Sequence, residues 1–187
     1  MHIIETARLR LRPFTVDDLD ALHAAVYGDA EVTRYLPGGA PWPREKVQKL
    51  IAFYVKHWEE HGFGPWAVIH RADSRFIGEA GLNTVPKTDP PEVEVLYAYA
   101  RAYWGRGIAT ESASASLRYG FEEAGLERII ALAFPENIAS QRVMQKIGMT
   151  HEGLQYYYDA DLETYSISRE AFQWDGSPYR LTGLGPS

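Results

Sequence analysis

The sequence contains no cysteine among its 187 residues. This absence excludes disulfide bonds, thiolate metal sites and cysteine nucleophiles, and it gives no sign of an oxidising compartment. The N-terminus also lacks a basic stretch followed by an apolar run, the pattern of a secretory signal peptide. No apolar run approaches the ~20 residues that a membrane-spanning helix needs. We therefore expect a cytoplasmic protein with no membrane partner.

An excess of positive charge is missing as well. The chain has 19 Lys and Arg residues against 25 Asp and Glu residues, and its formal net charge is −6. Nucleic-acid-binding proteins usually carry a basic face, so we expect no nucleic-acid partner. The six histidines show no metal-site spacing, and we expect no metal. The remaining composition, 45% hydrophobic and 24% charged, is ordinary for a globular chain of one-domain length.

Hydrophobic periodicity predicts a mixed sequence of strands and helices. Alternation of apolar and charged residues predicts an edge-type strand at residues 9–13, and helical spacing predicts helices at 15–28 and 43–62. The later elements expected are strands at 65–70, 75–82 and 93–99, a helix at 107–123, a strand at 128–134, a helix at 137–147, and strands near 150–158 and 163–168. This order favours an α/β fold, with an α+β mixed sheet flanked by about four helices. One domain would cover residues 1–174, followed by a tail at 175–187 rich in Gly, Pro and Ser.

The segment from Trp104 to Thr110 leads directly from a predicted strand into a predicted helix. Gly105 and Gly107 allow a tight turn and a close approach of the backbone to a ligand. The free N–H groups at a helix start favour anions such as phosphates, and Arg106 adds a cation. The same glycines also suit a plain strand-to-helix turn that binds nothing.

Two other phosphate-binding motifs do not fit this segment. A P-loop needs Gly-Lys-Ser/Thr, which is absent, and a dinucleotide fingerprint needs a third glycine where Thr110 stands. A second polar helix start follows the next predicted strand, where Asn137 can cap the helix and Ser140 lies one turn later. Alone, this second motif indicates no more than a capped helix.

Together the motifs resemble the GNAT superfamily of N-acetyltransferases. They are Glu94-Val95-Leu96-Tyr97, the run from Tyr103 to Glu111, Asn137 with Ser140, and Lys146-Ile147-Gly148-Met149. The chain is most similar to the branch that acetylates ribosomal-protein N-termini at alanine or serine, and its opening run from Glu5 to Arg12 resembles the first strand of that branch. The element order from residue 8 to about 170 matches that fold. The resemblance implies a single GNAT-like domain.

The resemblance implies acetyl-CoA as the co-substrate. Its pyrophosphate would lie over the loop formed by Trp104, Gly105, Arg106, Gly107, Ile108, Ala109 and Thr110. The pantetheine arm would pair with the strand at Tyr97, Ala98 and Tyr99, and Asn137 and Ser140 would meet the arm or the thiol. Arg101, Arg142 and Lys146 are the candidates for the 3′-phosphate.

For catalysis the resemblance suggests Glu94 as the general base, acting directly or through a water. Glu92, two residues earlier, is the alternative. A carboxylate has a reference pKa of about 4.3, so burial would have to raise it for work near neutral pH. Many relatives protonate the thiolate with a tyrosine seven residues after the asparagine, but Met144 stands there. Ser140 is then the expected proton donor, with the run from Tyr156 to Tyr158 as the alternative, and a backbone N–H near Tyr99 is the expected oxyanion donor.

The expected reaction is acetyl transfer from acetyl-CoA to a primary amine. The acceptor would be a protein N-terminus or a small-molecule amine, and a homodimer is plausible from the resemblance. A non-catalytic acyl-CoA-binding regulatory module is the alternative, for which replacing Glu94 would leave function untouched. An NADP-dependent enzyme is a third hypothesis, disfavoured by the missing third glycine.

Overall fold

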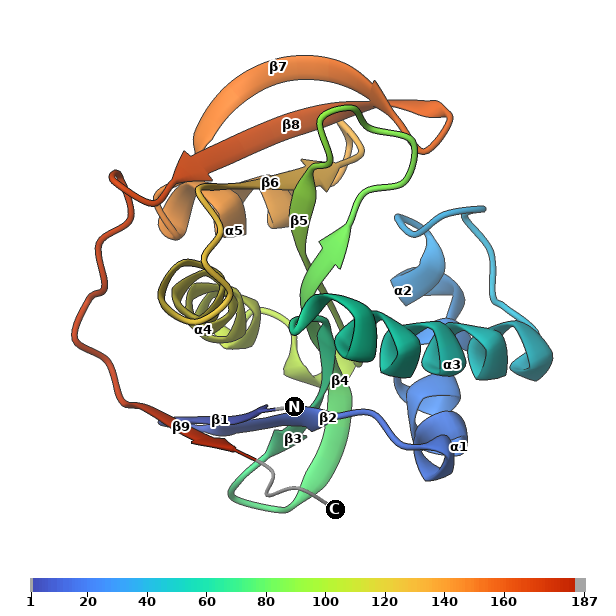
Figure 1. Ribbon diagram of the computed structural model, residues 1–187. Coiled ribbons are helices and arrows are strands. Elements are labelled where there is room, and N and C mark those ends of the chain that lie inside the picture. Colours follow the sequence, from blue (N-terminus) through green and yellow to red (C-terminus); the bar gives the residue numbers. More distant parts are fainter. Residues whose placement is uncertain (1, 184–187) are drawn as a thin grey trace.

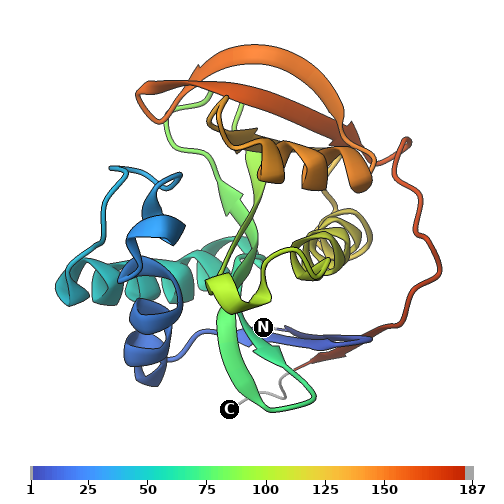
Figure 2. The same ribbon diagram turned by 180° about the vertical axis from the view of Figure 1, so that it is seen from behind.

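The computed structural model describes residues 2–183, which form a nine-stranded sheet with helices on both faces (Figures 1 and 2). The strands are β1 (His2–Thr6), β2 (Leu9–Pro13), β3 (Pro65–His70), β4 (Arg75–Thr84), β5 (Val93–Tyr99), β6 (Arg128–Ala133), β7 (Thr150–Tyr157), β8 (Ala160–Ser168) and β9 (Tyr179–Gly183). The α-helices are α1 (Leu19–Leu22), α2 (Ala30–Thr33), α3 (Arg44–His61), α4 (Ile108–Glu122) and α5 (Ile138–Lys146). The predicted mixed α/β class is confirmed.

The strand order is β7-β8-β6-β5-β4-β3-β2-β1-β9. β5 and β6 are parallel neighbours joined through α4, which confirms the predicted central strand–helix–strand unit. These two strands pair at a single register position, Glu94 with Ile130. Their carboxyl ends therefore separate, and α4 and α5 begin next to the opening.

The strand predicted at residues 9–13 is present, but its predicted position at the edge of the sheet is wrong. β2 lies inside the sheet, because β1 pairs with it on one side and β3 on the other. β1 was missed because His2–Thr6 is short and carries two adjacent isoleucines instead of a clean alternation. Its Ile4 and Thr6 are nevertheless buried.

The predicted helix at 15–28 is divided in the structure. A 3₁₀ turn at Val16–Asp18 precedes α1, a π-helical turn at His23–Tyr27 follows it, and Asp29 starts α2 by accepting a hydrogen bond from the Glu31 N–H. Thr15 does mark the start of this region, since its N–H donates to the Asp18 carboxylate at 2.8 Å. The sheet therefore has five α-helices around it where about four were expected.

The segment expected as a tail contributes the outermost strand. Tyr179–Gly183 forms β9, which pairs with β1, and Tyr179 and Leu181 pack against the core. The Gly, Pro and Ser around this strand hide its short alternation in the sequence. Residues 184–187 of the predicted tail lie outside the described residues.

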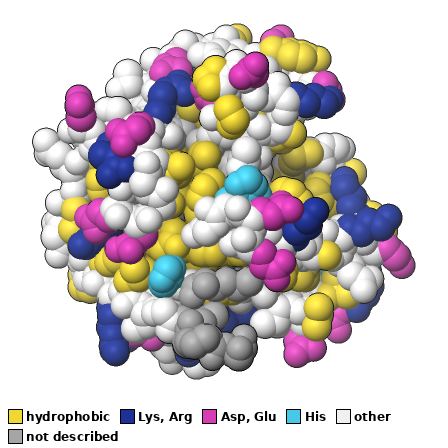
Figure 3. Space-filling view, viewed as in Figure 1, with side chains coloured by type: hydrophobic (Ala, Val, Ile, Leu, Met, Phe, Trp, Pro, Cys, Tyr) yellow, Lys and Arg dark blue, Asp and Glu magenta, His cyan; other side chains and the backbone are white. Residues whose placement is uncertain are grey.

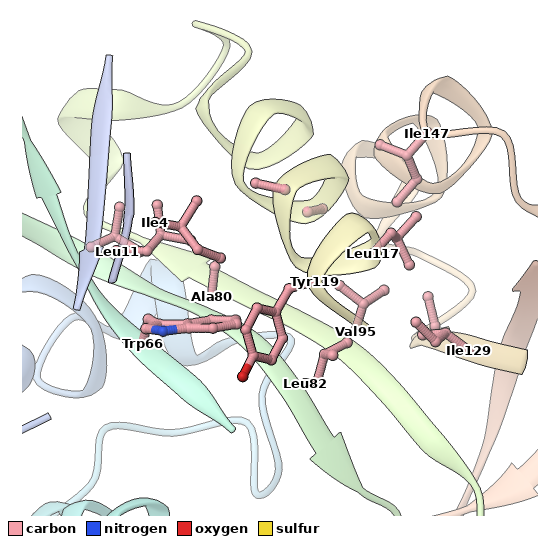
Figure 4. Packing of buried hydrophobic residues seen from close by; sticks show 14 of the residues in the cluster. Ile4, Leu11, Trp66, Ala80, Leu82, Val95, Leu117, Tyr119, Ile129 and Ile147 are labelled. Atoms are coloured by element: carbon pink, nitrogen blue, oxygen red, sulfur yellow. The ribbon is translucent and has the colours of Figure 1, made fainter. Parts of the chain in front are cut away.

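The hydrophobic core lies on both faces of the sheet. The larger cluster packs the sheet against α4 and α5, with Trp66 and Tyr119 edge to face at 5.1 Å between ring centroids (Figure 4). The smaller cluster packs α1–α3 against the opposite face. Small residues bring α4 close to the sheet: a Cβ on Gly120 would lie only 2.7 Å from the Ile129 side chain. The two faces meet at β5, whose Tyr99 belongs to the first cluster and Ala98 to the second.

Candidate active site

A cavity of about 380 Å³ lies where β5 and β6 separate. All of the predicted cofactor residues except Arg106 line it: Tyr97, Ala98, Tyr99, Trp104, Gly105, Gly107, Ile108, Ala109, Thr110, Asn137, Ser140 and Lys146. Val32 and Tyr35, from the region of α2, add a wall that the sequence did not indicate. The structure thus joins three separate segments of the chain around one space.

The turn before α4 requires glycine because of its backbone conformation. Gly105 has φ +70° and Gly107 has φ +75°, in the left-handed region that other residues rarely adopt. A Cβ at Gly105 would meet nothing within 4 Å, so crowding does not explain the glycine. The first N–H groups of α4 have no partner within the helix and face the same cavity end as Gly107. This arrangement suits a phosphate group.

The turn is tied to the N-terminal strands by Arg8. Its Nη1 donates to the Arg106 carbonyl at 2.7 Å, and its Nε pairs with the Glu111 carboxylate at 2.6 Å. Glu111 also accepts from the Arg8 backbone N–H and from the Thr6 hydroxyl. The opening motif of the chain and the first turn of α4 therefore form one hydrogen-bonded unit.

The predicted cations are divided between two places. Arg142 and Lys146 line the cavity from α5. Arg101 instead pairs with Asp29 at 2.7 Å, and the Arg106 guanidinium lies over the Tyr103 ring at 5.6 Å. A second hollow of about 340 Å³ shares Gly107, Thr110 and Lys146 with the first and is also lined by Asp175, Ser177 and Pro178.

The open edge of β5 presents backbone groups to the cavity. The Ala100 N–H donates to Ile77 on the β4 side, so the preceding Tyr99 carbonyl points the other way. The Trp104 indole already donates to that carbonyl at 2.7 Å. Because alternate residues point their N–H and C=O groups to the same side, the Tyr99 N–H and the Tyr97 peptide groups face the opening.

Hydroxyl groups of Tyr97 and Ser140 meet across the opening. The Tyr97 hydroxyl lies 2.9 Å from the Ser140 Oγ and donates to the Ser140 carbonyl at 3.2 Å. Asn137 caps α5, as predicted, by accepting from the Ser140 N–H at 3.2 Å. Met144 is fully buried in the core, so the position of the family tyrosine carries no proton donor.

Glu94 and Glu92 have different surroundings. Glu94 is buried and accepts hydrogen bonds from Asn83 at 3.2 Å and from the Tyr158 hydroxyl. Burial raises the pKa of Glu94, and these two donors act in the opposite direction. Glu92 lies before β5 and pairs with Arg128 at 2.7 Å. Glu94 does not itself line the cavity, but it shares a face of β5 with Ala98, which does.

A second buried carboxylate, Glu79, was missed in the sequence. It lies opposite Ala98 in the neighbouring strand and accepts from the Tyr27 hydroxyl at 2.5 Å, while its other oxygen has no partner. Burial raises the pKa of Glu79 from 4.5 to about 7. The sequence feature that could have indicated a buried carboxylate is a single acidic residue inside the apolar run from Ile77 to Leu82.

These groups fit acetyl-CoA as a co-substrate. The glycine turn with its free N–H groups and the side chains of Arg142 and Lys146 suit the phosphate end, and the open strand edge suits the amide-bearing arm.

Over the residues described, no cluster of metal-binding side chains is found, and no helix has the length and apolar character to cross a membrane. Acidic and basic side chains are interspersed over the face shown in Figure 3.

Comparison with known proteins identifies the fold and the chemistry together. The family model for the acetyltransferase (GNAT) domain matches residues 8–150. The uncharacterized N-acetyltransferase YoaA of Bacillus subtilis is 33% identical over 171 residues, covering 88% of this chain and 96% of YoaA. A GNAT-family acetyltransferase from Bacillus anthracis superposes with a TM-score of 0.75 at 29% identity, over 90% of this chain and 99% of that one.

A more distant structure has the same fold with coenzyme A bound. RimL, the ribosomal L7/L12 α-N-protein acetyltransferase in complex with coenzyme A, superposes with a TM-score of 0.75 at 19% identity, over 90% of this chain and 99% of RimL. The match to the family model covers both strand-to-helix junctions that build the cavity. The chain therefore belongs to the GNAT family and is an acetyl-CoA-dependent acetyltransferase.

Proposed function

We propose that this enzyme transfers the acetyl group of acetyl-CoA to a primary amine by direct attack of the amine on the thioester. The observation that supports this proposal most strongly is that the turn before α4, the open edge of β5 and the start of α5 line one cavity. A C–N bond forms and the C–S bond breaks. An ammonium acceptor loses two protons in all. One proton is released to solvent through the base, and the second balances the proton that the departing thiolate takes up to become the CoA thiol.

The donor would lie along the cavity with its phosphates at the turn. The N–H groups at the start of α4 would bind the pyrophosphate, and Arg142 and Lys146 supply positive charge nearby. The free Tyr99 N–H and the Tyr97 carbonyl would pair with the pantetheine amides as an added strand does. The Tyr97 N–H faces the same opening further from the turn, where the acyl group would lie, which supports it as a donor to the oxyanion.

Glu94 is the proposed general base, acting through a water. Its burial favours the protonated form and so brings its pKa toward the range where a base works near neutral pH. It lies on the Ala98 face of β5, on the side of α1–α3, so the acceptor would arrive from that side. Glu92 is a weaker candidate because Arg128 holds its carboxylate in an ion pair.

Ser140 is the proposed proton donor to the departing thiolate. Its hydroxyl is oriented by Tyr97 at 2.9 Å and lies at the start of α5, where the positive end of the helix dipole favours negative charge. After the transfer the serine regains its proton from solvent. Tyr158, the other candidate, donates to Glu94 and so helps to position the base instead.

The acceptor would be a protein N-terminus or a small-molecule amine. An α-amine has a reference pKa of about 8 against about 10.4 for a lysine side chain, so it loses its proton more easily. The wall formed by Val32 and Tyr35 lies on the acceptor side of β5 and would contact this substrate. The cytoplasmic location and the homodimer stay predictions from the sequence.

Calorimetric titration with acetyl-CoA, with NADPH as the control ligand, tests the donor site. We expect micromolar acetyl-CoA binding that falls at least about a hundredfold in Gly107→Val, because valine is strained at φ +75° and would displace the turn. Gly125→Val is the matched control, since Gly125 has φ +72° in open space at the other end of α4. Equal losses in the two variants, or no binding by the wild type, would contradict the donor site.

A screen of amines, read by release of free CoA thiol, then tests the transfer. A regulatory module would bind acetyl-CoA and release no thiol with any amine. An enzyme would release thiol in proportion to the acetylated amine, identified by mass spectrometry.

A further inference from the structure

We propose that Tyr97, tethered to Ser140, forms the wall that restricts the transferred group to acetyl. This inference rests on the proposed donor site, and it names a determinant of acyl-chain length that the family membership does not provide. It concerns the end of the cavity opposite to the phosphate-binding turn.

The position of Tyr97 along the cavity follows from the two elements that it connects. Lys146 lies beside the turn, because it lines both hollows together with Gly107. Ser140 is six residues earlier on α5, which places it about 9 Å from Lys146 along the helix axis. On β5, Tyr97 lies about 7 Å before Tyr99, on the side away from the turn. Tyr97 is thus the cavity-lining residue of β5 that lies furthest from the turn, and it meets Ser140 on α5, with Asn137 three residues further along.

The Tyr97 end of the cavity is also where β5 and β6 come together. Three residues before Tyr97, Glu94 pairs with Ile130, and the two strands close the space between them. A donor that enters with its phosphates at the turn therefore presents its acyl group to Tyr97 last. Any carbon beyond the acetyl methyl would have to occupy the volume of the Tyr97 ring or pass beside it.

The Tyr97 ring is held in place at both ends. Its backbone belongs to a central strand, and its ring packs against the larger core cluster. Its hydroxyl makes two contacts to Ser140, at 2.9 Å to Oγ and at 3.2 Å to the carbonyl oxygen. A side chain fixed in this way cannot turn aside without losing both contacts, so it acts as a rigid wall.

The test compares free CoA, acetyl-CoA, propionyl-CoA and butyryl-CoA as calorimetric ligands, so that no acceptor is needed. One additional methylene against a fixed wall changes selectivity by roughly ten- to 200-fold. We expect the wild type to bind butyryl-CoA at least about a hundredfold more weakly than acetyl-CoA. Tyr97→Ala should reduce this ratio below about ten, and Tyr97→Phe, which keeps the ring but loses the tether, should give an intermediate ratio.

Tyr103→Ala is the matched control, because Tyr103 lines the same cavity beside the turn. It should leave the butyryl-to-acetyl ratio at the wild-type value. A wild type that binds both ligands equally well would overturn the proposal without any variant. So would an unchanged ratio in both Tyr97 variants. These outcomes leave the donor site intact, whereas a wild type that binds none of the acyl-CoAs would overturn the donor site as well.

Discussion

The two sides of β5 are built in different ways. On the cavity side the main features are backbone groups: the turn at Gly105 and Gly107, the start of α4 and the free edge of the strand. On the side of α1–α3 they are side chains from distant segments. Glu79 meets Tyr27 across 52 residues of sequence, and Glu94 meets Tyr158 across 64. The donor side should therefore respond mainly to changes of backbone conformation, and the acceptor side to single side-chain atoms.

The sharpest test of this difference is Glu94→Gln, which changes one atom on the acceptor side. We expect kcat to fall by roughly 10²- to 10⁴-fold, because the amide cannot accept the proton of the acceptor. The Kd for acetyl-CoA should stay within about twofold of the wild type, since Glu94 lies outside the donor cavity. Steady-state kinetics and calorimetry measure the two quantities separately.

Glu92→Gln is the control for this variant. It removes a neighbouring carboxylate that pairs with Arg128 at 2.7 Å. We expect a change in kcat below about threefold, since surface ion pairs contribute little. A larger fall in kcat for Glu92→Gln than for Glu94→Gln would show that Glu92, and not Glu94, is the base.

The next largest effect concerns Glu79 and the pH dependence of the free energy of unfolding. Its pKa is about 7 in the folded protein against an ordinary value of 4.5, so the folded state binds more protons between these two pH values. The contribution of Glu79 to the free energy of unfolding is therefore fully present below pH 4.5 and is lost as the pH rises through 7. The loss amounts to about 3 kcal/mol.

Urea unfolding of the wild type and Glu79→Gln between pH 5 and pH 8 tests this. The variant should have similar stability at pH 5 and should become the more stable protein by pH 8, because its amide stays neutral. Glu59→Gln, on the exposed face of α3, is the control and should keep the pH dependence of the wild type. A constant difference between wild type and Glu79→Gln across this range would show that Glu79 does not titrate there.

The smallest effect is expected for Arg8→Ala, which acts on the donor side through the backbone. Loss of the hydrogen bond to the Arg106 carbonyl and of the Glu111 ion pair should loosen the turn and weaken acetyl-CoA binding about three- to tenfold. Arg118→Ala, which breaks the Glu122 pair on the same helix at 2.8 Å, should leave the Kd unchanged. Equal effects would mean that α4 as a whole, and not the turn, is affected.

Much of the donor side could be predicted from the sequence because its signals are local. Gly105 and Gly107 stand next to the helix that they start, and Asn137 stands three residues before the N–H that it accepts from. The exceptions are Arg101 and Arg106, which the sequence suggested as phosphate ligands. Arg101 pairs with Asp29 and the Arg106 side chain lies over Tyr103, because a long exposed side chain has several partners within reach.

The sequence by itself determined the element types from α3 to β8, the central strand–helix–strand unit and the family, because these depend on periodicity and on contiguous motifs. Tertiary structure alone decided the rest: that β2 is an inner strand, that β9 joins the sheet, that Glu79 lies beside Ala98, and that Tyr97 reaches Ser140. Each of these is a contact between segments far apart in the chain. Such contacts depend on the order of strands in the sheet and on burial, which a local pattern does not encode.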